Sequence, residues 1–205
     1  KAMRISAGIN WGVDMGSLIS KEQLEIVDDH VKDAVDKGAR VLTGATTRPD
    51  LGPYFYEPTI LEGVHDEMDV HQEETFGPVI SVYPFASEAE AVALANEGDY
   101  GLNAAVYSRD GARARRIANQ IKCGTVNINE AFGATFASID APMGGMRSSG
   151  MGRRQGAEGI HRYTEVQSVA TQYLLRFGPF MGLTDQAYAN VMAASLKALK
   201  ALGRA

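Results

Sequence analysis

Short β-prone runs alternate with helical patterns over the first 130 residues, and this alternation is the feature that most limits the possible folds. The β-prone runs are 40–43, 78–83, 103–108 and 124–128, with a further extended candidate at 57–64. Helical patterns begin at three residues that can cap a helix N-terminus, namely Ser20, Ser87 and Asp110. Strands that are joined by helices usually run parallel within one sheet. The order therefore predicts an α/β fold with a parallel sheet and crossover helices.

A stretch with six glycines, residues 129–156, ends this alternation. A phosphate-binding loop is one interpretation of it. However, the spacing of Gly150, Gly152 and Gly156 does not match the dinucleotide fingerprint, and the chain has no Gly-Lys-Ser or Gly-Lys-Thr. A tightly packed loop, with glycines at positions that need a positive φ angle, explains the stretch better.

The end of the chain has a third pattern. Residues 163–172 form a continuous β-prone run, and apolar residues at helical spacing follow it, which predicts an amphipathic helix. That spacing is set by Tyr188, Val191, Met192, Ser195, Leu196, Leu199 and Leu202. The chain begins with Lys1 and has no signal-peptide pattern, so we expect it to be a piece of a longer protein.

Charge and composition exclude several classes of partner. The chain of 205 residues has 20 Lys and Arg against 25 Asp and Glu, a net charge of −5, and nucleic-acid binders are expected to be basic. No apolar run approaches the length of about 18 residues that a membrane span needs. The single cysteine, Cys123, cannot form an intramolecular disulfide, so we expect a reducing, cytoplasmic setting.

Cys123 and the histidines are the remaining candidates for chemistry. Cys123 follows a predicted helix C-terminus, whose negative end disfavours a thiolate, so we expect a structural role rather than a nucleophile. His65 and His71 lie among acidic residues in a loose, metal-like cluster. Their spacing matches no zinc motif, so we predict solvated loop residues and no metal site.

The sharpest local motif is Glu-Glu-Thr-Phe-Gly-Pro over residues 73–78, directly before a predicted strand. On composition alone, a solvated turn with its aromatic ring folded onto the core is the favoured interpretation. The functional alternative is a carboxylate that accepts two sugar hydroxyls, with a ring that packs against a flat cofactor.

Taken in order, several motifs resemble the NAD(P)-dependent aldehyde dehydrogenase superfamily over roughly residues 10–172. These motifs are 73–78, Tyr100-Gly101-Leu102, Gly-Thr-Val-Asn-Ile-Asn at 124–129, Pro142-Met143-Gly144-Gly145, Ser149-Gly150 and Tyr163-Thr164-Glu165. Within the superfamily, Ile-Asp-Ala-Pro-Met-Gly-Gly-Met at 139–146 is similar to bacterial succinate-semialdehyde dehydrogenases. Members are more than twice as long as this chain, which therefore resembles their C-terminal half.

The resemblance implies roles for five residues. Glu74 resembles the glutamate that holds the nicotinamide ribose, and Phe76 resembles the ring near the nicotinamide. Gln23 resembles a residue that reaches the adenosine-side ribose in some members. Ser138 and Phe132 resemble substrate residues, with Ser138 on the far carboxylate of succinate semialdehyde and Phe132 in the aldehyde tunnel. Met143 replaces a phenylalanine that is common before the paired glycines.

The resemblance also implies what this chain does not carry. The nucleophilic cysteine, the general-base glutamate and the nucleotide-binding domain lie upstream in the family, so no catalytic residue is assigned here, and the chain alone is predicted to be inactive. The implied organisation is a partial catalytic domain over 1–163, an oligomerisation strand over 164–172 and a tail with a helix over 173–205.

The expected cofactor is NAD or NADP, and the expected assembly is a homo-oligomer, a dimer or tetramer, formed through residues 164–171. Two alternatives remain open. One is a dehydrogenase for another semialdehyde, and the other is a non-enzymatic binding or assembly module with the same fold.

Overall fold

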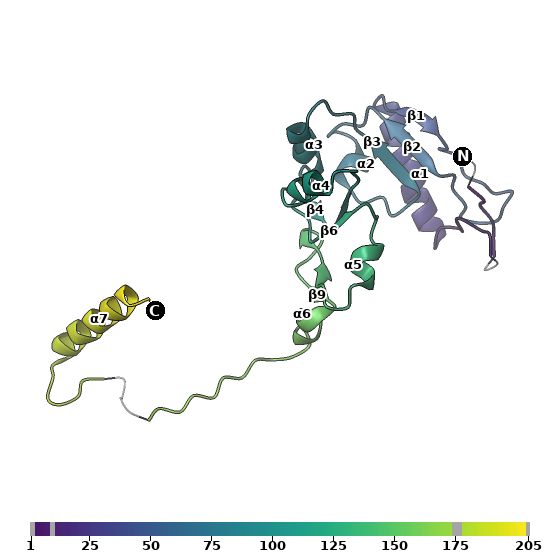
Figure 1. Cartoon of the computed structure of the whole chain (residues 1–205). Helices are drawn as coiled ribbons and strands as arrows, with labels where there is room; N and C mark the ends of the chain where they lie inside the picture. The colour runs from purple at the N-terminus through teal and green to yellow at the C-terminus, as the bar shows by residue number, and fades with distance from the viewer. Residues whose placement is uncertain (1–2, 9–10, 174–177, 204–205) are drawn as a thin grey trace. The chain divides into compact units, whose positions relative to one another are not determined.

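The computed structural model describes residues 3–8, 11–173 and 178–203, which form two compact units, Lys1–Tyr163 and Thr164–Ala205 (Figure 1). The helices are α1 (Lys21–Asp36), α2 (Asp69–Gln72), α3 (Glu88–Ala95), α4 (Gly111–Ala118), α5 (Gly133–Ala137), α6 (Gly156–His161) and α7 (Asp185–Ala201). The strands are β1 (Arg40–Thr43), β2 (Thr59–Glu62), β3 (Val79–Val82), β4 (Tyr100–Gly101), β5 (Asn103–Val106), β6 (Thr125–Ile128), β7 (Met143–Gly144), β8 (Met146–Arg147) and β9 (Arg153–Arg154).

The first unit is α/β, as the sequence predicts, but its strands form several small sheets. β1, β2 and β3 make a three-stranded sheet in that order, while β4–β8, β5–β6 and β7–β9 make two-stranded sheets. β2 pairs with β3, and β5 with β6, in parallel; each of these two pairs is joined through a helix. The expectation of parallel strands was wrong for β1, which runs antiparallel to β2. No described helix lies between β1 and β2, and a parallel pair needs a crossover that a direct return of the chain does not provide.

The hydrophobic core of this unit lies where α1 packs on the β1–β2–β3 sheet (Figure 1). Ser20 caps α1 by accepting a hydrogen bond from the Gln23 backbone N–H at 3.2 Å, and Gly38 follows the helix with a φ of 106°. One face of α1 is buried, and it carries Val27, His30, Val31 and Ala34. The core side chains are Val27, Val31, Ala34, Ala39, Tyr56, Leu61, Val64 and Met68. Each fully buried large side chain contributes about 1.5–3 kcal/mol relative to exposure.

The glycine-rich stretch is more ordered than the sequence predicts, since it contains α5 and the short strands β7, β8 and β9. The predicted tight packing is confirmed. A positive φ angle explains the need for glycine at only some of these positions. Gly150 and Gly156 have φ angles of 90° and 60°. At Gly124 and Gly144, by contrast, an added Cβ would collide with the carbonyl oxygens of Gly144 and Gly152, so these positions need glycine because backbones approach each other closely.

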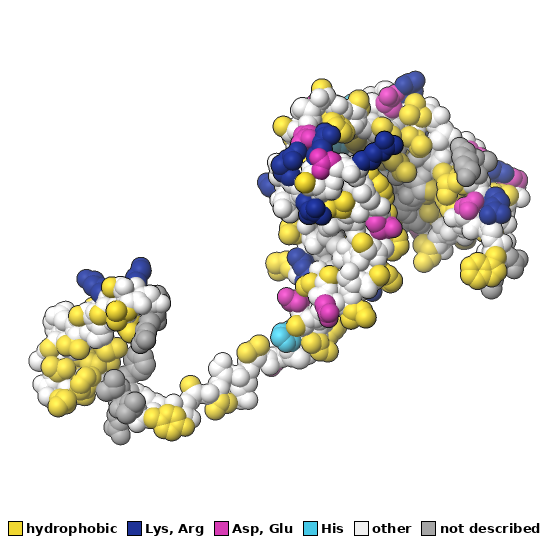
Figure 2. All heavy atoms as spheres, viewed as in Figure 1, with side chains coloured by type: hydrophobic (Ala, Val, Ile, Leu, Met, Phe, Trp, Pro, Cys, Tyr) yellow, Lys and Arg dark blue, Asp and Glu magenta, His cyan; other side chains and the backbone are white. Residues whose placement is uncertain are grey.

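The second unit contains α7, which confirms the predicted helix, and an extended segment before it. Residues 164–173 are assigned to neither strand nor helix and pair with no strand of the described chain, so the predicted strand is absent here. A β-strand needs a neighbour for its backbone N–H and C=O groups. Hydrophobic side chains are exposed along this segment and along α7 (Figure 2). None of the described helices is long and apolar enough to cross a membrane.

Candidate functional site

Residues 73–78 connect α2 to β3 and lie against α1. The Gln23 side chain in α1 donates from Nε2 to the Thr75 carbonyl oxygen at 2.8 Å. A second α1 side chain, His30, lies 3.1 Å from the Thr75 hydroxyl through Nδ1. At the far end of the motif, the Thr59 N–H in β2 donates to the Pro78 carbonyl at 2.7 Å. The motif is therefore tied to both α1 and the sheet.

Gly77 makes the closest approach between this motif and α1. A Cβ at Gly77 would lie 3.2 Å from Cγ1 of Val27 and closer still to Cγ2. Because Val27 is fully buried, it has no room to move aside. Only glycine lets the backbone of the motif pass the helix at this distance.

Phe76, directly before Gly77, has a φ of 45°, which is unusual for a residue with a side chain. Such a conformation costs about 1–3 kcal/mol and persists where the surroundings enforce it, often at functional sites. The ring is 70% exposed, so burial does not compensate for this cost. The expectation of a ring folded onto the core is therefore wrong, and the geometry fits the functional alternative.

Glu74 is the open acid of the motif. Within the described part of the chain its carboxylate has no hydrogen-bond or ion-pair partner, whereas Glu73 faces His30 at 3.7 Å. Glu74 and Phe76 line one cavity of about 460 Å³, together with His71, Val79 and Tyr83. The structure thus places in one cavity the two residues to which the resemblance gives cofactor roles.

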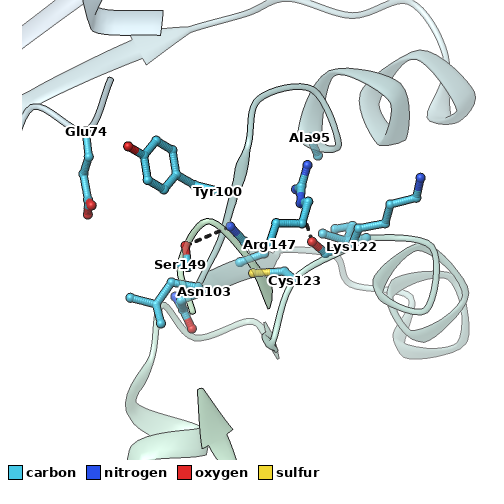
Figure 3. A pocket seen from close by; sticks show the side chains of 12 residues that line it. Glu74, Ala95, Tyr100, Asn103, Lys122, Cys123, Arg147 and Ser149 are labelled. Carbon is cyan, nitrogen blue, oxygen red and sulfur yellow. Dashed lines mark hydrogen bonds between the residues drawn. The ribbon is translucent and has the colours of Figure 1, made fainter. Parts of the chain in front are cut away.

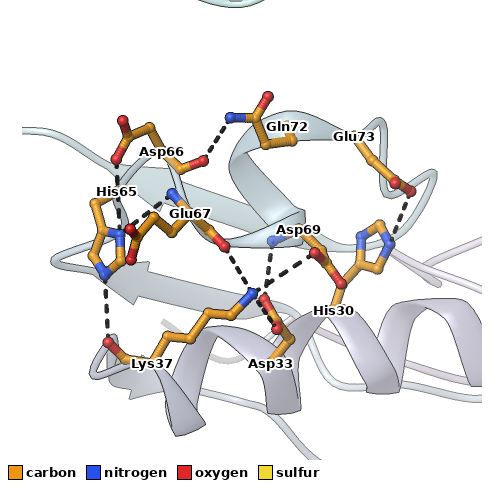
Figure 4. A network of polar contacts seen from close by, with 9 residues as sticks. All are labelled: His30, Asp33, Lys37, His65, Asp66, Glu67, Asp69, Gln72 and Glu73. Atoms are coloured by element: carbon orange, nitrogen blue, oxygen red, sulfur yellow. Dashed lines mark hydrogen bonds and ion pairs between the residues drawn. The ribbon is translucent and has the colours of Figure 1, made fainter.

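A polar network fixes α2 to α1 just before the motif (Figure 4). Lys37 pairs with Asp33 at 2.6 Å and with Asp69 at 3.8 Å, and it donates to the Glu67 carbonyl at 2.7 Å. The Asp69 N–H donates to the Asp33 carboxylate at 2.9 Å. The hydrogen bond from Lys37 is the main cause that lowers the pKa of Asp33 below its usual value.

The histidines near this network contact neighbouring polar groups. Among the described residues, no group of three or more His, Cys, Asp or Glu side chains is arranged to hold a metal ion. His65 instead contacts the Lys37 carbonyl at 3.4 Å, and His71 contacts the Tyr83 hydroxyl at 3.1 Å.

Glu74 also borders a second cavity, of about 290 Å³, whose other walls come from the turns around β4, β6 and β8 (Figure 3). Cys123 lies in this wall, which the sequence did not predict. Its thiol has no hydrogen-bond partner among the described residues, and its backbone N–H donates to the Ile121 carbonyl at 3.0 Å. The site therefore shows no activating group in contact with Cys123.

Arg147 and Ser149 form the floor of the same cavity by tying its turns together (Figure 3). The Arg147 guanidinium donates to backbone carbonyls that follow α3 and α4, those of Asn96, Glu97, Gly98 and Lys122. Ser149 Oγ accepts from the Gly101 N–H at 3.0 Å. Sequence reasoning missed Arg147; the available signal was a basic residue that can satisfy carbonyls at a helix C-terminus.

Phe132 and Ser138 lie at opposite ends of α5, the first at its N-terminus and the second at its C-terminus. The Phe132 ring is 54% exposed and packs edge-on against Phe136, with centroids 6.0 Å apart. Ser138 Oγ donates to the Ala134 carbonyl at 2.7 Å, which leaves its lone pairs available to accept. Neither residue lines the two cavities beside Glu74.

Gln23 lies close to the motif and contacts its backbone. Its amide N–H is engaged by Thr75, so the contact seen here holds the motif in place, and the predicted contact with a ribose stays a prediction.

The nicotinamide end of a dinucleotide fits Glu74 and Phe76. A ribose presents two hydroxyls, and an ionised carboxylate without other partners can accept both. The exposed ring of Phe76 offers a flat apolar surface in the same cavity. A motif tied at Thr75 and Pro78 would hold both groups without further ordering.

Known proteins share this sequence and fold. Residues 1–169 match the aldehyde dehydrogenase family. A putative succinate-semialdehyde dehydrogenase (NADP+) from Mycolicibacterium smegmatis is 48% identical over 202 residues, which is 98% of this chain and 39% of that protein.

Solved structures agree. Succinate-semialdehyde dehydrogenase from Burkholderia pseudomallei has a TM-score of 0.70 at 41% identity, over 78% of this chain and 33% of that one. An NAD+ complex of aldehyde dehydrogenase from Bacillus cereus has a TM-score of 0.74 at 38% identity, over 82% of this chain and 33% of that one. The chain therefore spans less than half the length of these proteins.

Proposed function

The chain belongs to the aldehyde dehydrogenase family, and from that premise we propose that it is the C-terminal part of an NAD(P)-dependent enzyme that oxidises succinate semialdehyde to succinate. The similarity to succinate-semialdehyde dehydrogenases supports this substrate. The observation that carries the proposal is the pair formed by Glu74 and Phe76, an unpaired carboxylate and an exposed, strained aromatic residue in one cavity.

In the proposed reaction a thiolate outside this chain attacks the aldehyde, and water later hydrolyses the thioester. The nicotinamide supplies the acceptor for the hydride. This chain contributes the wall against which the nicotinamide riboside is held, with Glu74 accepting ribose hydroxyls and Phe76 packing near the ring. Cys123 has no activating partner in the described structure, which supports a non-catalytic role.

For the substrate, we assign Phe132 to the wall of the aldehyde tunnel and Ser138 to the distal carboxylate. A substrate carboxylate only accepts hydrogen bonds, so the Ser138 hydroxyl would have to donate to it. In this structure the hydroxyl already donates to the Ala134 carbonyl. Binding would therefore require the hydroxyl to rotate away from the helix. We also propose that residues 1–163 are part of the catalytic domain.

Residues 164–172 are proposed as the strand that joins a neighbouring subunit, followed by a tail over 173–205. Exposed Val166 and Val169 and the lack of a β-partner within the described chain support this role for the segment. The single cysteine of the chain supports a reducing, cytoplasmic setting.

The test is a steady-state assay of the full-length protein that contains this chain, following NADH or NADPH formation by absorbance. Succinate semialdehyde is compared with a longer semialdehyde and with butanal, which lacks the carboxylate. We expect succinate semialdehyde to have the highest kcat/KM, and we expect the 205-residue chain alone to be inactive. No turnover of any aldehyde by the full-length protein would favour a non-enzymatic module. A higher kcat/KM for the longer semialdehyde would refute the proposed substrate.

A further inference from the structure

His30 is a buried, titratable side chain that the proposed function leaves without a role. It lies on the inner face of α1 and is only 7% exposed. Its Nδ1 lies 3.1 Å from the Thr75 hydroxyl oxygen. Its Nε2 lies 3.7 Å from a carboxylate oxygen of Glu73, and Figure 4 shows this second contact. Both ring nitrogens thus face the same short segment, which is 43 to 45 residues away in the sequence.

The two residues that His30 faces are the immediate neighbours of Glu74. The contacts from α1 to Glu73 and Thr75 fix the chain on both sides of Glu74. Glu73, Glu74, Thr75 and Phe76 all line the cavity of about 460 Å³, so the segment that His30 contacts forms one wall of that cavity.

One arrangement of protons satisfies these groups together. A Thr75 hydroxyl that donates to Nδ1 leaves the ring proton on Nε2, where it faces the Glu73 carboxylate. Leaving a buried ring nitrogen unpaired is costly, so the position of the segment and the orientation of the ring are coupled. Gln23 adds a bond to the Thr75 carbonyl, but of the residues that the structure describes only His30 contacts side chains on both sides of Glu74.

We propose that His30 is a positioning residue that, through Thr75 and Glu73, holds Glu74 and Phe76 in the geometry that binds the nicotinamide riboside. The link to the cofactor rests on the proposed function, whereas the positioning of residues 73–77 does not. The inference therefore has a structural test and an enzymatic test, and the two can fail separately.

The structural test measures amide hydrogen exchange of residues 73–77 in the 205-residue chain. Within this segment the Glu73 N–H donates to the Asp69 carbonyl at 2.8 Å, and we expect His30→Ala to accelerate exchange of this amide by about threefold to tenfold, the factor that corresponds to one net hydrogen bond, while β2 stays protected. His65→Ala is the matched control, because His65 is partly exposed and contacts only neighbouring polar groups. It should leave residues 73–77 unchanged. Unchanged exchange in His30→Ala, or equal acceleration in β2, would overturn the proposal.

Conservative variants separate positioning from general packing. An asparagine at position 30 can place an amide near the site of Nδ1, and a glutamine can reach the site of Nε2. Because the contact with Thr75 is the shorter one, His30→Asn should restore more protection than His30→Gln. Thr75→Val removes the same contact from the other side, so adding it to His30→Ala should accelerate exchange little further. Fully additive effects would contradict the coupling.

The enzymatic test uses the full-length protein. His30→Ala should raise the KM for the dinucleotide by about threefold to tenfold and change kcat at saturating dinucleotide by less than about twofold, with His65→Ala unchanged. A loss in kcat alone would refute positioning of the cofactor residues. If the wild-type protein is inactive with every aldehyde, the proposed function fails, and the exchange measurement still decides the role of His30.

Discussion

Replacing Gly77 by alanine should push residues 73–78 away from α1, because the new methyl group has no space beside Val27. The added Cβ would lie 3.2 Å from Cγ1 of Val27 and closer to Cγ2, and Val27 is fully buried. Gly77 is not among the glycines with positive φ, so the cost is steric rather than conformational. Overpacking of this kind costs about 1–3 kcal/mol, and we expect Gly77→Ala to lower the free energy of unfolding by that amount.

Combining Gly77→Ala with Val27→Ala adds a methyl group at residue 77 and removes methyl groups from residue 27. Val27→Ala alone should cost about 2 kcal/mol, from the lost burial of its methyl groups and the space that they leave. In the double variant the methyl group of residue 77 occupies part of that space. The double variant should therefore be about as stable as Val27→Ala, with a coupling of about 1–3 kcal/mol relative to additivity.

The assay is urea unfolding of the 205-residue chain, followed by far-ultraviolet circular dichroism. Gly16→Ala is the control, because a Cβ there meets nothing within 4 Å and no positive φ is involved. Its stability should be unchanged or slightly raised. A free energy of unfolding for Gly77→Ala within about 0.5 kcal/mol of wild type, or additive effects in the double variant, would refute the close-approach argument.

Three further outcomes are expected. Phe76→Gly should relieve the left-handed strain and change stability by about 0 to +1 kcal/mol in urea unfolding, while weakening dinucleotide binding by the full-length protein; a clear loss of stability would contradict the strain. Arg147→Ala should cost about 1–2 kcal/mol in the same assay by freeing carbonyls after α3 and α4, whereas Arg109→Ala, which has no partner among the described residues, should cost nothing measurable. Hydrogen bonds from the Arg116 and Arg113 side chains lower the pKa of Glu88, and the hydrogen bond from the Arg113 backbone N–H lowers the pKa of Asp110. The resulting stabilisation is complete above the unfolded pKa of about 4 and is lost as pH falls through the lowered values. Thermal unfolding at a series of pH values checks this, since Glu88→Gln should show a weaker pH dependence than wild type.

Local signals in the sequence were enough to predict the main helices. Ser20 and Asp110 cap α1 and α4 as predicted, because capping depends on a side chain and the backbone two or three residues away. The order of motifs led to the family, and it singled out Glu74 and Phe76 although composition alone favoured a solvated turn.

Contacts between distant residues account for what the sequence did not predict. The direction of β1, the cavity beside Cys123 and the contacts of Arg147 depend on where the chain returns in space. The absence of a strand over 164–173 has the same origin, since strand pairing requires a second chain segment.

The periodicity of the helices, their caps and the residue types of the 73–78 motif can be read from local sequence, because these features depend on neighbours within a few positions. The contacts of Gln23 and His30 with Thr75, across 52 and 45 residues, and the passage of Gly77 past Val27 at a distance that excludes a methyl group arise from the folded chain. The physical reason is that hydrogen bonds and close packing act through space over a few ångströms, whereas a sequence pattern records only separation along the chain.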